Sequence, residues 1–94
     1  MPKITDLIPA DPVAMLRTGN PNDLPGDLYD AIIEVYAGLV SINRNPLASV
    51  PATARTMEAA ARQRGYTANQ AARLGDMAAM LCQEIATGIL LAVD

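Results

Sequence analysis

The side chains that could catalyse a reaction or bind a metal are few in this chain of 94 residues. Histidine is absent and Cys82 is the single cysteine, which excludes an intramolecular disulfide, a structural zinc site and a histidine-based catalytic dyad. A glycine-rich phosphate-binding loop is also absent. The remaining groups are ten carboxylates, three tyrosines, one thiol and the hydroxyls of serine and threonine.

Three of the carboxylates have a spacing that would suit a shared cation. Asp27, Asp30 and Glu34 are three and four residues apart, so on a helix they lie along one face. Asp27 and Asp30 also fall where a helix begins, and acids there are stabilised by the positive end of the helix dipole without any ligand. We therefore predict no metal site at this position.

Cys82 is the other candidate group, because a thiolate can act as a nucleophile. It has no basic neighbour in the sequence and lies in a row of small residues, which favours a buried, inert thiol. The sequence thus predicts no catalytic residues, no metal, no cofactor and no enzymatic activity.

The composition predicts an all-α fold, a small helical bundle in which residues 1–94 form a single domain. Hydrophobic residues make up 51% of the chain, but Phe and Trp are absent and Tyr occurs three times. A core of Ala, Leu, Ile, Val and Met favours helices that pack closely, and it lacks the large contribution of buried aromatic rings. Such a modest core raises the expectation that oligomerisation adds stability.

The first main helix is predicted over residues 27–43, and much of its surface is apolar and must be covered by other parts of the fold. Its hydrophobic residues form two adjoining rows, which together cover more than half of its circumference. The first row consists of Leu28, Ala31, Ile32, Val35, Leu39 and Ile42, and the second consists of Tyr29, Ile33, Tyr36 and Val40. A helix with this pattern must be covered on two sides.

The segment 1–26 is rich in proline and is predicted to hold one short helix over residues 12–18. Asp11 and Pro12 form a favourable helix start and Gly19 a plausible end. Val13 and Leu16 are the expected anchors, with Met15 as a third candidate. Leu7 and Ile8 are expected to pack in extended conformation before this helix. Between the helices a loop is expected, in which Asp23 is a candidate cap for a helix beginning at Leu24.

The second main helix is predicted over residues 51–64, because Pro51 suits a first helical turn and Gly65 a C-terminal end. Residues 47–50 are expected to be a connector or a single helical turn. The inward residues would be Val50, Ala54, Met57 and Ala61.

The third main helix is predicted over residues 67–92. Thr67 and Gln70 fit a capping box, and the turn from Gly65 to Thr67 is so short that the last two helices must form an antiparallel hairpin. A row of small residues would let a neighbouring helix approach closely: Gly75, Ala79, Cys82 and Ala86. Met80, Leu90 and Leu91 fall outside the apolar rows of this helix.

A nucleic-acid-binding role is the alternative that we weigh against protein binding. Part of the last helix resembles a degenerate helix-turn-helix, but its would-be recognition helix holds no Lys or Arg. We favour one uninterrupted helix through Gly75. A row of arginines could still contact a phosphate backbone without reading bases: Arg55, Arg62, Arg64 and Arg73.

The surplus of apolar residues favours a protein-interaction module, because large apolar patches on small proteins usually meet a partner. We expect a homodimer that binds and modulates, as an inhibitor or adaptor, a larger regulatory protein of unknown identity. The expected interface residues are Tyr29, Ile33, Tyr36, Val40, Met80, Leu90 and Leu91. The N-terminus lacks the pattern of a secretory signal and no apolar run has the length of a membrane span, so we expect a cytoplasmic protein without membrane association.

Overall fold

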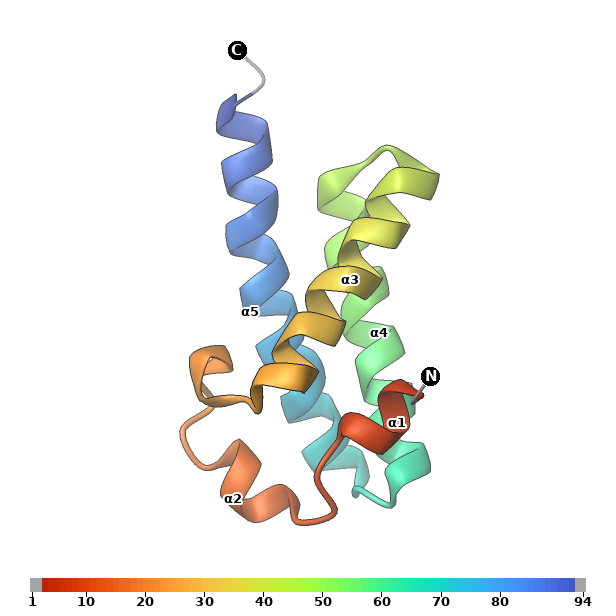
Figure 1. Ribbon diagram of the computed structural model, residues 1–94, viewed down its shortest axis with the longest axis vertical. Coiled ribbons are helices and arrows are strands. Elements are labelled where there is room, and N and C mark those ends of the chain that lie inside the picture. Colours follow the sequence, from red (N-terminus) through yellow and green to blue (C-terminus); the bar gives the residue numbers. More distant parts are fainter. Residues whose placement is uncertain (1–2, 93–94) are drawn as a thin grey trace.

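The computed structural model describes residues 3–92, and within this range the chain is helical and contains no β-strand (Figure 1). The elements are α1 (Ile4–Leu7), α2 (Pro12–Leu16), the 3-10 turn η1 (Pro21–Asp23), α3 (Gly26–Asn43), α4 (Pro46–Arg64) and α5 (Ala68–Ala92). The all-α prediction with three main helices is therefore confirmed.

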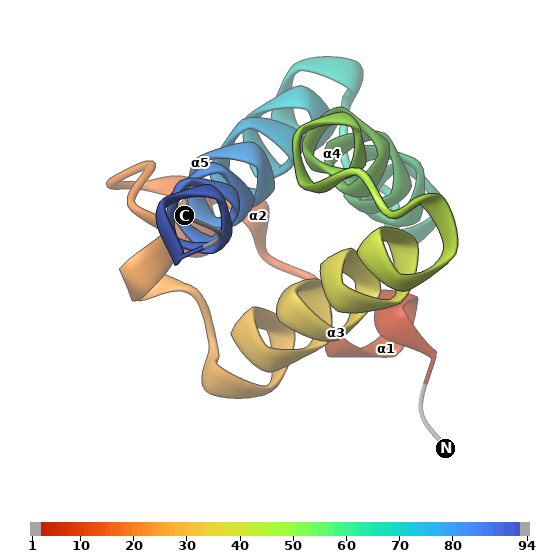
Figure 2. The same ribbon diagram turned by 90° about the horizontal axis from the view of Figure 1, so that it is seen from above.

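Helix α4 is the centre of the bundle. It packs against α5 along one side and against α3 along another, whereas α3 and α5 make few direct contacts (Figure 2). The short N-terminal elements lie at the opposite end from the α3–α4 turn, with α1 against α3 and α4, and with α2 and η1 against α5 (Figure 1).

The α4–α5 hairpin forms as its sequence predicts. Gly65 ends α4 with φ of 107°, and the Thr67 amide donates to Gln70 Oε1 at 3.0 Å while the Gln70 amide donates to Thr67 Oγ1 at 3.2 Å. Helix α5 continues without a break through Gly75, as we favoured. A Cβ atom at Gly75 would lie 3.1 Å from the carbonyl oxygen of Ala54, so the absence of a side chain lets α4 and α5 approach closely.

The start of α4 differs from the prediction, which placed it at Pro51. The helix begins five residues earlier, where Asn45 Oδ1 accepts from the Ala48 amide at 3.1 Å and Pro46 occupies the first helical position. Pro51 lies inside the helix and is exposed, and its missing N–H leaves the carbonyl four residues earlier without its intrahelical partner. Arg44, with φ of 54°, is the left-handed residue that ends α3.

The N-terminal segment holds one more helical turn than expected. Leu7 belongs to α1 rather than to an extended stretch, whereas Ile8 is extended as predicted and fully buried. Helix α2 ends at Leu16, two residues early, and Met15 and Leu16 are its buried residues. Val13 is 70% exposed and is not an anchor.

The turn before α3 also differs in one detail from the prediction. Asp23 does not cap a helix at Leu24, because α3 begins at Gly26 after Pro25. Instead, the Asp23 carboxylate accepts a hydrogen bond from the Thr18 hydroxyl at 2.6 Å. This contact closes the loop that contains η1, and Leu24, the next residue, is buried in the core.

Candidate protein-interaction surfaces

The buried face of α3 lies where its two predicted apolar rows meet, so it includes residues of both rows. The fully buried residues of this helix are Leu28, Ile32 and Tyr36, four residues apart. Tyr36 is 1% exposed, and its hydroxyl donates to the Pro46 carbonyl at 2.8 Å, which ties α3 to the start of α4. Burial, with Cys82 nearby as a smaller cause, raises the pKa of Tyr36. Tyr36 is thus a core residue, and it offers almost no surface to a partner.

The other predicted interface residues of α3 lie at the edge of the core. Tyr29, Ile33 and Val40 are half-buried and pack against the buried cluster, as do Ile85 and Ile89 of α5. These five residues keep part of their apolar surface accessible.

The predicted interface residues of α5 are exposed, by 54% at Met80, 47% at Leu90 and 73% at Leu91. The last turns of α5 project upward, apart from the α3–α4 hairpin (Figure 1). Ile42 (78% exposed) and Leu47 (50% exposed) flank the α3–α4 turn at this same end of the molecule. We call the four residues Ile42, Leu47, Leu90 and Leu91 the open end.

The sequence does not identify two members of the open end. Ile42 has the spacing of an inward residue, and Leu47 falls in a predicted connector. The signal that could have identified Ile42 is its position in the last turn of α3, one residue before Asn43, where the next helix reverses direction and cannot cover it.

Two of the four arginines in the predicted row serve the fold. Arg64 Nε donates to the Ile8 carbonyl at 2.8 Å, and Arg73 donates to the Leu16 carbonyl. Both bonds hold the N-terminal segment against the bundle. Arg55 and Arg62 are exposed on α4. Of the row that could meet a phosphate backbone, only Arg55 and Arg62 lack such a bond to a backbone carbonyl within residues 3–92.

Cys82 lies fully buried between α4 and α5. Burial raises the pKa of its thiol from 9.0 to about 11, although a hydrogen bond with the Thr53 side chain lowers it in part. The thiol is therefore protonated at neutral pH and inaccessible, which leaves it without the properties of a nucleophile.

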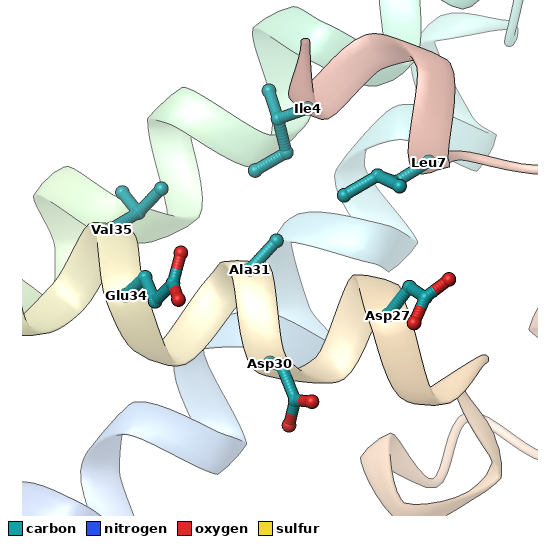
Figure 3. A pocket seen from close by; sticks show the side chains of 7 residues that line it. All are labelled: Ile4, Leu7, Asp27, Asp30, Ala31, Glu34 and Val35. Atoms are coloured by element: carbon teal, nitrogen blue, oxygen red, sulfur yellow. The ribbon is translucent and has the colours of Figure 1, made fainter. Parts of the chain in front are cut away.

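The three carboxylates Asp27, Asp30 and Glu34 line a groove of about 530 Å³ between α1 and α3. Ile4 and Leu7 reach from α1 toward α3, and Ala31 points toward α1 from between Asp27 and Glu34, whereas Asp30 points away from α1 (Figure 3). Within residues 3–92, no group of three or more His, Cys, Asp or Glu side chains has the geometry to hold a metal ion. The groove is apolar on its α1 side and acidic along α3.

Helix α5 has the length and apolar composition of a membrane-spanning helix, contrary to the sequence prediction that no apolar run is long enough. A mostly buried core helix of a soluble protein meets the same criterion, and 39% of the most apolar 18-residue stretch of α5 is buried within the protein. Packing against α4 buries the apolar residues on one side of α5, whereas Leu90 and Leu91 near its C-terminus are exposed.

Comparison of the chain with protein-family models, with curated proteins and with solved structures finds no significant match.

Proposed function

We propose that this chain is a small non-enzymatic interaction module that forms a homodimer and, as a dimer, binds and modulates a larger regulatory protein as an inhibitor or adaptor. The observation that carries the proposal is the open end, where four large aliphatic side chains are between 47% and 78% exposed. Val40 of α3 and Ile89 of α5, close in sequence to these residues, are half-buried at the edge of the core.

A second copy of the chain is the occupant that fits the open end best. From Leu74 to Ala92, α5 contains no Lys or Arg, so it lacks the cations with which surface helices bind anionic lipid or nucleic acid. A two-fold axis would bring the same apolar patch of both copies together and bury twice the surface of one subunit. Complete burial of such a side chain contributes roughly 1.5–3 kcal/mol, so a few per subunit suffice for association.

Single charges placed at the open end test the dimer. We expect Leu90→Asp and Leu91→Asp each to shift the protein from dimer to monomer in size-exclusion chromatography with light scattering. Asn69→Asp is the matched control, because residue 69 is also exposed on α5 but is polar and lies at the opposite end of the helix, and it should leave the dimer intact. Circular dichroism should show the same helix content in all three variants. Equal masses for the Leu91→Asp variant and the wild type would contradict the proposal.

The nucleic-acid alternative gains no support from the fold, because Arg64 and Arg73 are committed to backbone carbonyls of the N-terminal segment. We expect duplex DNA to show no mobility shift at physiological salt. A shift that weakens steeply with salt and disappears in the Arg55→Ala, Arg62→Ala double variant would favour this alternative instead.

A further inference from the structure

We propose that the groove between α1 and α3 binds a basic, amphipathic segment of the regulated protein. This inference rests on the proposed function and specifies the chemistry of the second partner. The groove lies at the N-terminal half of α3, whereas Ile42 of the open end lies in its last turn, so both surfaces can be occupied at once (Figure 1).

The apolar side of the groove suits one or two aliphatic side chains of a partner. Ile4 and Leu7 form the α1 wall, and Ala31 and Val35 of α3 face it. All four are only partly buried in this chain, so each keeps apolar surface that a partner can cover. The lining residues of α3 span Asp27 to Val35, which corresponds to about 12 Å along a helix, or two turns of a bound helix.

The acidic side of the groove determines the charge of the partner. Asp27, Asp30 and Glu34 are all exposed, and among the described residues that line the groove there is no Lys or Arg. Because α3 begins at Gly26, the helix dipole explains Asp27, the one acid in the first turn, but not Asp30, contrary to the sequence expectation, and not Glu34. A segment with Lys or Arg beside its apolar residues complements this pattern.

Repulsion between the closely spaced acids lowers the stability of the free protein, and a basic partner would relieve this repulsion. Asp30 and Glu34 are four residues apart on one helix, and like charges at this spacing destabilise a helix. Neutralising Glu34 should therefore raise the melting temperature of the free protein while it weakens partner binding. A residue with a purely structural role would not show these opposite effects.

The binding test uses the full chain and a designed probe. The probe is a fluorescein-labelled helical peptide with leucines at positions i, i+3 and i+7 and lysines on both flanks of that stripe. Fluorescence anisotropy at moderate salt should show saturable binding, and a peptide of the same composition with scrambled order should bind more weakly. In ¹H–¹⁵N correlation spectra, the bound peptide should perturb amides of 4–7 and 27–35.

Matched neutralisations separate the groove from the overall acidity of the protein. Asp27→Asn with Glu34→Gln should weaken peptide binding about tenfold, and this difference should shrink as salt rises. Asp76→Asn with Glu84→Gln removes the same charge from exposed positions of α5 and should leave binding unchanged. Ala31→Leu fills the groove without changing charge and should weaken binding at every salt concentration.

Three outcomes would overturn the groove proposal. The first is equal affinity for the ordered and scrambled peptides, and the second is equal loss of binding in the two neutralised variants. The third is dissociation of the homodimer in the Asp27→Asn, Glu34→Gln variant, which would identify the occupant of the groove as a second copy of the chain. The proposed dimer is tested separately, because Leu91→Asp should abolish dimerisation without loss of peptide binding.

Discussion

At the scale of single residues, the buried thiol of Cys82 and the buried hydroxyls of Tyr36 and Tyr66 make the stability of the protein depend on pH in the alkaline range. Burial raises the pKa of Cys82 from 9.0 to about 11, and it also raises the pKa values of Tyr36 and Tyr66 above 10.0. Each group holds its proton more tightly in the folded state, so the stabilisation is complete below the unfolded pKa and is lost as pH rises through the folded pKa.

We therefore expect the free energy of unfolding in urea titrations to fall between about pH 9 and 11, the interval set by Cys82. The Cys82→Ala variant should lose less stability across this interval than the wild type does. Stability that increases over the same interval would contradict the assignment of a buried, protonated thiol.

The same thiol provides a direct test of its accessibility. In the folded protein Cys82 is 0% exposed, so a thiol reagent such as dithionitrobenzoate reaches it only when the helices open. We expect its reaction at neutral pH to be about a hundredfold or more slower than in urea, because the unfolded fraction of a stable domain is small. Rapid stoichiometric labelling of the native protein would show that the thiol is accessible.

Tyr66 anchors the N-terminal segment to the hairpin. Its hydroxyl donates to the Pro9 carbonyl at 2.6 Å, and the side chain is 5% exposed. Tyr66→Phe removes this bond and should lower the free energy of unfolding by about 1 kcal/mol. Tyr29→Phe, which changes a half-buried tyrosine at the edge of the core, should have a smaller effect in the same urea titration. An equal loss of unfolding free energy in the two variants would contradict the anchoring role of the Tyr66 hydroxyl.

At the scale of the elements, the contact between α4 and α5 depends on Gly75. A Cβ atom there would lie 3.1 Å from the backbone oxygen of Ala54, while a Cβ at Gly38 would meet no atom within 4 Å. We expect Gly75→Val to lower the free energy of unfolding by about 1–3 kcal/mol through overpacking. Gly38→Val should be neutral or slightly stabilising, because valine favours a helix more than glycine does. Thermal melts of both variants provide the comparison, and an unchanged melt for Gly75→Val would contradict this packing.

The elements also show which parts of the fold are visible in the sequence. Helices α3 and α5 were predicted within one residue at their starts, because long apolar periodicity and a capping box are local signals. The start of α4 was predicted five residues too late because a proline such as Pro51 is typical of the first turn of a helix. It is tolerated inside the helix because its ring faces water and Asn45 supplies the cap upstream. The single turn of α1 is too short for periodicity, and its packing on α3 and α4 fixes it.

The candidate surfaces were predictable only in part, for related reasons. The exposure of Leu90 and Leu91 follows from their positions outside the apolar rows of α5, which the sequence reveals. The burial of Tyr36 depends on a carbonyl acceptor at Pro46, across the turn, and this tertiary contact leaves no local pattern. The groove likewise depends on the packing of α1 against α3.

At the scale of the whole molecule, the described chain is elongated, with extents of 43 × 27 × 22 Å. Helix α4 contacts both long neighbours, and α3 and α5 diverge toward the open end (Figure 2). This arrangement places the apolar open end and the acidic groove at different positions along the long axis. A dimer joined at the open ends would present two acidic grooves to its partners, an arrangement that increases the apparent affinity for a multivalent target.

Sedimentation equilibrium of the wild-type protein tests the central claim, self-association through the open end, most directly. We predict a molar mass twice that of the 9.9 kDa chain at tens of micromolar, with dissociation on dilution. The Leu91→Asp variant should sediment as a monomer at the same concentration. A wild-type protein that sediments as a monomer at tens of micromolar would contradict the account.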